Sequence, residues 1–200
     1  MAFGVSFCLL VIAMTVHEFA HGWVAFKLGD PTAKYSGRLT LNPRAHIDAF
    51  WTVILPLFLF ISSSGRFVFG AAKPVPVNYW ALKNPKRDMV LIGASGPAVN
   101  LVFAVILAIA IKIIPLPLVA VSLVINLIAI NVVLGVFNLI PIPPLDGSRV
   151  LAGLLPEPLA SGYASIEPYS FIILLALIWM GALNWFIWPL VELILRFLGV

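Results

Sequence analysis

Long uninterrupted apolar stretches constrain the fold of this chain more than any other feature. They occupy residues 2–28, 89–114, 117–140 and 170–198, and each is long enough to cross a bilayer, which takes about 20 residues of helix. Charged residues make up only 10% of the chain and the mean hydropathy is +1.10, whereas soluble domains contain about 25% charged residues. The sequence therefore predicts an all-α polytopic membrane protein with four or five transmembrane helices.

One further apolar run is too short to span. It covers residues 49–61 and contains Pro56 near its middle, and this length is typical of a re-entrant or interfacial segment. The segments before and after it are both basic, and basic loops lie preferentially in the cytoplasm. We therefore expect residues 27–48 and 65–88 to face the cytoplasm, with the short run dipping into the membrane between them.

The last apolar run, 170–198, allows two interpretations. It contains Pro189, and Glu192 and Arg196 form an i, i+4 pair near its end. One kinked span is compatible with this pattern, and so is a span followed by an interfacial helix.

The basic residues indicate orientation in a membrane and not nucleic-acid binding. The chain has 12 Lys and Arg against 8 Asp and Glu, a net charge of +4, and its cations lie almost entirely between the apolar runs. Cations in such loops set the orientation of a membrane protein. We expect the lipid bilayer as a partner and no nucleic acid.

Three ionisable residues interrupt the first apolar run. His17, Glu18 and His21 form the pattern H-E-x-x-H, and burying such groups in hydrocarbon is costly unless they serve a function. Residues four apart project from one helix face, so both imidazoles can bind one ion while Glu18 reaches a water on that ion. The pattern is that of zinc proteases, and with three histidines in the chain a chance occurrence is rare.

Catalytic zinc needs a third protein ligand and one open position. Asp146 follows the run 117–140, and the predicted topology places it at the depth of the two histidines. A divalent ion with the carboxylates of Asp146 and Glu18 sums to zero charge, which a low-dielectric site tolerates best. Asp-Gly after prolines is also an ordinary turn signal, but together with the helix motif we expect one zinc ion per chain, bound by His17, His21 and Asp146.

The chain resembles the site-2 protease family of intramembrane zinc metalloproteases in five motifs, which are HEFAH (17–21), LNPRAHID (41–48), FGAAKPVPVN (69–78), GPAVN (96–100) and NLIPIPPLDG (138–147). The resemblance covers most of residues 10–150 and points to the compact branch without PDZ or CBS domains. It implies zinc binding by His17, His21 and Asp146, with Glu18 as the catalytic base, near the cytosolic side of the membrane. Residues 1–200 would then form a single integral-membrane metalloprotease domain, with a catalytic core of about 2–150 and a C-terminal helical segment of about 165–200.

The same resemblance implies a substrate class and a location. The substrate would be a transmembrane protein, cut in or near its membrane segment by regulated intramembrane proteolysis, in the cell membrane of a bacterium or archaeon. A regulatory membrane protein is a further partner that such proteolysis allows. The family's asparagine before the Asp-Gly motif falls on Asn138, whose amide would hold the substrate backbone or the oxyanion. Two departures from this branch, AFW at 49–51 and Ala71 in place of a tryptophan, lie outside the metal motifs.

Other functions use some of the same residues. A metal transporter should line several spans with ligands, whereas only two segments of this chain carry any. A catalytically inactive membrane scaffold is a further alternative. An iron oxygenase also binds its metal with two histidines and a carboxylate, but it has no use for a glutamate beside the first histidine.

Three weaker polar signals remain open. His46 is compatible with a gate or auxiliary ligand, although an ordinary loop histidine is the simpler interpretation. Asn100 follows a Gly-Pro pair in the run 89–114 and suits a position facing the site as well as simple helix packing. Asn131 suits helix packing.

The segment KPVPVN, residues 73–78, lacks backbone donors at Pro74 and Pro76. In an extended strand both missing donors lie on one edge, so only the other edge can pair fully. Together with residues 66–69, this pattern predicts a small β-hairpin near the membrane surface whose open edge could pair with an unwound substrate. A proline-rich surface loop explains the pattern equally well.

Overall fold

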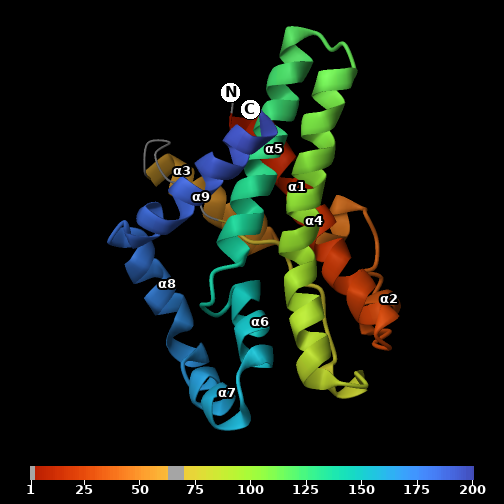
Figure 1. The fold of residues 1–200 in the computed structure, drawn as a ribbon, viewed down its shortest axis with the longest axis vertical. Coiled ribbons are helices and arrows are strands. Elements are labelled where there is room, and N and C mark those ends of the chain that lie inside the picture. Colours follow the sequence, from red (N-terminus) through yellow and green to blue (C-terminus); the bar gives the residue numbers. More distant parts are fainter. Residues whose placement is uncertain (1–2, 63–69) are drawn as a thin grey trace.

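The computed structural model describes residues 3–62 and 70–200, which fold into helices joined by loops (Figure 1). Within these ranges four segments are long and apolar enough to cross a membrane, namely Gly4–Lys27, Pro85–Ile113, Leu118–Asn138 and Glu157–Trp179. Within the described ranges the chain forms no β-strand. The prediction of an all-α polytopic membrane protein is confirmed.

Three long helices form the centre of the fold: α1 (Phe3–Lys27), α4 (Pro85–Ile113) and α5 (Leu118–Asn138). α4 and α5 form an antiparallel hairpin along the longest axis, and α1 packs against both (Figure 1). Small residues at the contacts permit close approach, because a Cβ added to Gly135 of α5 would lie 3.1 Å from the carbonyl oxygen of Pro97 on α4. Such small-residue contacts are typical of helix packing in membranes.

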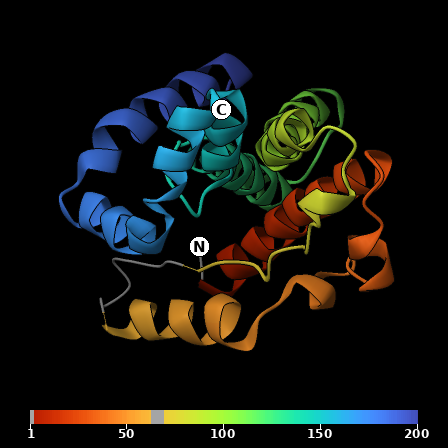
Figure 2. The same cartoon turned by 90° about the horizontal axis from the view of Figure 1, so that it is seen from below.

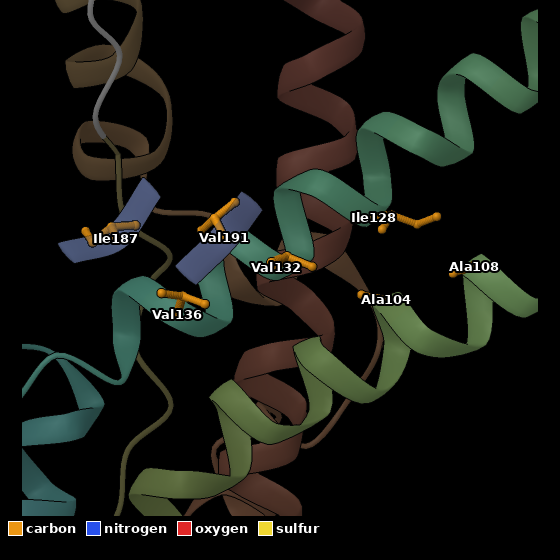
Figure 3. Packing of buried hydrophobic residues seen from close by; sticks show 7 residues of the cluster. All are labelled: Ala104, Ala108, Ile128, Val132, Val136, Ile187 and Val191. Carbon is orange, nitrogen blue, oxygen red and sulfur yellow. The ribbon is translucent and has the colours of Figure 1, made fainter. Parts of the chain in front are cut away.

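The buried apolar core lies where α4 and α5 meet α9 (Ala182–Leu198). Figure 3 shows its residues, which are Ala104, Ala108, Ile128, Val132, Val136, Ile187 and Val191. On each helix these residues are four positions apart, so each helix contributes one face. Large apolar side chains on other faces of these helices are exposed, as expected for a protein that is surrounded by lipid.

The C-terminal run forms two helices, so the single-span interpretation is wrong. α8 (Ser170–Trp179) is separated from α9 by Met180 and Gly181. Gly181 has a φ of 69°, in the left-handed region that other residues rarely adopt. Pro189, where the sequence suggested a kink, lies inside α9. The fourth apolar segment instead begins before α8, at α7 (Glu157–Ala164), and continues through the turn η4 (Glu167–Tyr169).

The short apolar run forms a π-helical turn, η2 (Ala49–Ile54), and the helix α3 (Leu55–Ser62). The chain that follows this run is hydrogen-bonded back to η2. Ala71 N donates to Trp51 O at 3.1 Å, and Thr52 Oγ1 donates to Ala71 O at 2.7 Å. Residues 66–69, half of the predicted hairpin, lie outside the described residues. Residues 70–78 are extended but form no strand.

Buried polar side chains join the two basic loops on either side of the short run. The first loop contains the short helices α2 (Thr32–Tyr35) and η1 (Pro43–His46), and the second contains η3 (Tyr79–Ala81). Asp30, which is fully buried, accepts a hydrogen bond from Asn78 N at 2.7 Å. Arg38 Nη2 donates to Lys73 O at 2.5 Å. Because these bonds cross from one loop to the other, both loops lie at the same end of the helices (Figure 2).

This arrangement predicts that both loops are accessible from one side of the membrane. In a background in which Cys8 is replaced by alanine, we expect Ser36→Cys and Asn78→Cys to react with an impermeant maleimide from the cytoplasmic side. Leu118→Cys, which is exposed at the far end of the α4–α5 hairpin, should react from the opposite side. Reaction of Ser36→Cys and Asn78→Cys from different sides would contradict the re-entrant assignment.

Candidate metal centre

Three donor atoms from distant parts of the chain lie together between α1 and α6 (Asp146–Leu154). His17 Nε2 and His21 Nε2 are 3.0 Å apart. Asp146 Oδ2 lies 2.9 Å from the first nitrogen and 3.1 Å from the second. All three residues are buried, with 4–6% of their surface exposed. The structure thus brings together the three residues that the sequence analysis assigned to the metal.

His17 Nε2, His21 Nε2 and Asp146 Oδ2, which together we call the donor group, fit tetrahedral zinc. Ligand bonds of 2.0–2.2 Å imply donor separations of roughly 3.3 Å, within a few tenths of an ångström of those observed. Two imidazoles and one carboxylate are also suitable zinc ligands. Over residues 3–62 and 70–200, no fourth His, Cys, Asp or Glu joins this group, so a tetrahedral ion held by these three atoms would keep one position for water or substrate.

Asp146 reaches the histidines because α5 is followed by a compact loop of residues 139–145. The loop is closed by a hydrogen bond from Leu145 N to Ile142 O of 2.9 Å. Gly147 packs against it, since an added Cβ would lie 2.5 Å from Ile140 O. On the other side, a Cβ on Gly93 of α4 would lie 3.1 Å from the carbonyl oxygen of Asp146. Glycines on both sides therefore let α6 place Asp146 in the group.

Gly96 of α4 lies directly against the two imidazoles. A Cβ at this position would lie 2.6 Å from both Cε1 and Nε2 of His17, and it would also overlap His21 Nε2. Real Cβ atoms do not approach other atoms so closely. Gly96 of the Gly-Pro pair therefore faces the site.

The second nitrogen of each imidazole is fixed by α4. His17 Nδ1 lies 2.5 Å from Asn100 Oδ1, and His21 Nδ1 lies 2.7 Å from the carbonyl oxygen of Ile92. Both partners are acceptors, so each Nδ1 carries a proton, and each Nε2 faces Asp146 Oδ2, where it would give its lone pair to a metal in place of its hydrogen bond with the carboxylate. Such outer partners commonly set the tautomer and ring orientation of metal-binding histidines.

Asn100 is in turn held by two other helices. Its Nδ2 donates to Asn131 Oδ1 of α5 at 2.7 Å and to Ala13 O of α1 at 3.2 Å. Asn131 Nδ2 donates to Leu127 O at 2.8 Å, and both asparagines are fully buried. Sequence reasoning treated Asn131 only as a packing residue and missed this chain of amides behind His17.

The second carboxylate oxygen of Asp146 is also bound. Arg149 Nη1 donates to Oδ1 at 3.1 Å. Burial disfavours the charged form of Asp146, but its hydrogen bonds with His17 and His21 outweigh this effect and hold the pKa of the carboxyl well below its ordinary value. Asp146 is therefore ionised at neutral pH, as a metal ligand must be.

Glu18 is held by a loop and lies outside the donor group. Its Oε2 accepts a hydrogen bond of 2.8 Å from Val75 N, in the extended segment 70–78 that runs beside α1 (Figure 2). Arg38 fixes this segment by donating to the carbonyl oxygens of Lys73 and Pro74. The loop thus holds the carboxylate of Glu18 outside the group of three donor atoms.

Two other predicted residues lie apart from the donor group. Asn138 Nδ2 donates to Leu134 O of its own helix at 2.9 Å, and no hydrogen bond within the described ranges links it to the donors. His46 is buried, and its Nε2 donates to Thr40 O at 2.8 Å. Its backbone carbonyl accepts from Lys73 N at 2.9 Å, so His46 contributes to loop packing.

Comparison with known proteins gives consistent matches. The model of peptidase family M50 matches residues 5–118 and 116–181. The chain is 36% identical over 192 residues to the "Putative zinc metalloprotease YwhC" of Bacillus subtilis, covering 92% of this chain and 84% of that protein. It is 33% identical over 179 residues to the "Putative zinc metalloprotease Rip2" of Mycobacterium tuberculosis H37Rv, covering 88% and 67%.

A more distant relative is the "Zinc metalloprotease MJ0392" of Methanocaldococcus jannaschii, with 27% identity over 151 residues, covering 76% of this chain and 34% of that protein. No solved structure matches the chain. The family matches span both the H-E-x-x-H helix and the Asp146 segment. The chain therefore belongs to peptidase family M50, the site-2 protease family, and is a zinc metalloprotease.

Proposed function

We propose that this protein hydrolyses a peptide bond in or near a transmembrane segment of another membrane protein. The observation that carries this proposal is the position of the donor group on a membrane-spanning helix. His21 precedes Lys27, the last residue of α1, by six positions, which is about 9 Å along the helix. Peptide hydrolysis at this depth requires a substrate that enters the membrane region, so soluble peptides are the less suitable class.

The proposed chemistry divides between the ligands and the base. His17, His21 and Asp146 would hold zinc, which supplies Lewis acidity toward a peptide carbonyl and makes water a better nucleophile. Glu18 accepts a proton from the attacking water and returns it to the leaving amide nitrogen. The hydrogen bond from Val75 N holds Oε2 of Glu18 at 2.8 Å, and we assign the proton transfer to Oε1.

The location and partners are part of the same proposal. The two basic loops near the donor group favour the cytoplasmic side, in the cell membrane of a bacterium or archaeon. Asn138, which is half-buried at the end of α5, would orient the substrate backbone. Residues 1–200 would act as one metalloprotease domain in regulated intramembrane proteolysis, with a regulatory membrane protein as a further partner.

A metal transporter is the less favoured alternative. Transport requires successive binding positions along a path through the membrane. Among residues 3–62 and 70–200, the His, Cys, Asp and Glu side chains form a single donor group. One group of three ligands with an open position suits catalysis better than transport.

The first test separates the base from the ligands. Glu18→Gln keeps the size of the side chain and its hydrogen bond but cannot accept a proton. We expect this variant to retain about one zinc per chain and to cleave roughly 10² to 10⁴ times more slowly, the usual effect of losing a general base. The assay would use a panel of single-span membrane proteins in detergent, with mass spectrometry of the products and metal analysis of the enzyme.

A chelator that removes zinc should stop cleavage by the wild-type protein, and added zinc should restore it. Substantial cleavage by zinc-loaded Glu18→Gln protein would rule out the proposed base. Loss of zinc from this variant would mean that Glu18 is a ligand.

The second test concerns the third ligand. Asp146→Ala leaves two neutral histidines facing a divalent ion in a buried site, so we expect most of the bound zinc to be lost. Glu157→Ala removes an equal charge from an exposed side chain and should leave the zinc content unchanged. Undiminished zinc in Asp146→Ala protein would show that another residue completes the site, and His46 would be the first to examine.

The third test concerns Gly96. Gly96→Ala adds a methyl group in the space of both imidazoles, so we expect zinc binding to weaken roughly 10- to 100-fold, as when support of metal ligands is lost. Gly162→Ala is the matched control, because a Cβ at Gly162 meets no atom of the described residues within 4 Å. Equal zinc affinity in the two variants would contradict the placement of α4 against the donor group.

A further inference from the structure

A small basic cleft separates the end of α1 from the beginning of α4, apart from the donor group. Its volume is about 250 Å³, and it is lined by Lys27 and the two loop residues after it, and by Lys83, Asn84, Arg87 and Asp88. The two sides of the cleft are more than fifty positions apart in the sequence. The fold therefore gathers cations that the sequence pattern shows only as separate basic loops.

The charges in the cleft favour an anion. Lys27, Lys83 and Arg87 are all exposed, and the described residues provide no ion pair for them. Among the described residues that line the cleft, the acidic side chain is that of Asp88, which is buried and accepts a hydrogen bond of 3.0 Å from Asn84 N. Three cations thus face one carboxylate that already binds the start of α4.

The cleft also lies at a membrane boundary. The apolar segment of α1 ends at Lys27, and that of α4 begins at Pro85. Trp23, one turn before Lys27, is 47% exposed, and Trp80 on η3 is 96% exposed. Exposed tryptophans at the ends of apolar spans are typical of the headgroup region. Lys27 Nζ lies 5.5 Å from the centre of the Trp23 ring.

We propose that this cleft binds the phosphate headgroup of an anionic phospholipid. The volume is below the roughly 300–1,000 Å³ of pockets for drug-sized ligands and suits a headgroup. Trp23 lies four positions before Lys27, and Leu91 lies four positions after Arg87, so each apolar residue shares a helix face with a cation. Both are exposed, which provides an apolar surface for acyl chains beside each cation.

Orientation in the membrane does not by itself explain the cleft. The positive-inside effect depends on the number of cations on one side, and cations outside the cleft serve it equally well. Lys34 Nζ lies 4.9 Å from the centre of the Phe26 ring, and Lys86 Nζ lies 3.3 Å from Glu157 Oε1. These two residues belong to the same basic loops without lining the cleft, so they provide a matched control.

The experiment compares two double variants of the full chain in detergent. Lys83→Gln with Arg87→Gln removes two cations from the cleft, and Lys34→Gln with Lys86→Gln removes two cations outside it. Each protein is titrated with short-chain phosphatidylglycerol, phosphatidylcholine and inorganic phosphate, and binding is followed by native mass spectrometry. We expect phosphatidylglycerol to bind roughly 25-fold more weakly to the cleft variant, about 5-fold for each lost cation, and normally to the control.

Equal phosphatidylglycerol affinity in both double variants would overturn the proposal. Phosphatidylcholine bound as tightly as phosphatidylglycerol would do so as well. A third outcome would also overturn the proposal of a lipid ligand. If inorganic phosphate binds the wild type as tightly as phosphatidylglycerol does, and this binding is lost in the cleft variant, the ligand of the cleft is a free anion.

Elution as a single species in size-exclusion chromatography serves as the check on folding, and zinc content adds a second check, because none of the cleft residues belongs to the donor group. If the cleft variant loses zinc, the single changes Lys83→Gln and Lys86→Gln provide the same comparison with less disturbance. A failure of the metal predictions would leave this comparison unaffected, so the two proposals are tested separately.

Discussion

Burial of two imidazoles and a carboxylate in one small volume is the constraint on which the rest of the structure depends. Groups of this kind are costly in a low-dielectric environment unless every polar atom has a partner. The donor group satisfies one nitrogen of each ring, and α4 satisfies the other through Asn100 Oδ1 and the carbonyl oxygen of Ile92. These contacts require α4 to approach α1 closely, which Gly96 permits.

Close approach of the helices and hydrogen bonds between buried amides stabilise the packing of α1, α4 and α5. In soluble proteins the hydrophobic effect has this role. Apolar helices gain little by leaving lipid for one another, so small residues and interhelical hydrogen bonds decide how they pack. Gly93 brings α4 against α6, and Gly135 brings α5 against α4. The hydrogen bond between Asn100 and Asn131 then fixes the register of α4 and α5, and it connects this register to the orientation of His17.

The metal donors and Glu18 are positioned by different parts of the molecule. His17 and His21 come from a membrane-spanning helix, whereas the carboxylate of Glu18 is held by the backbone of the loop 70–78. That loop is itself held by Arg38 and Asp30 at the end of the helices. The basic cleft lies at the same end, so in our proposals the surface that meets lipid headgroups is continuous with the loops that position the base.

The sequence by itself determined the membrane class, the apolar spans, the short run and the shared face of His17 and His21, because these follow from local hydropathy and the helical period. Topology also placed Asp146 at their depth. Only the tertiary structure decided that the C-terminal run breaks at Gly181, that Asn100 supports His17 and that Val75 holds Glu18. These features depend on which helix faces and loops meet, and contacts between distant segments leave no periodic signal in the sequence.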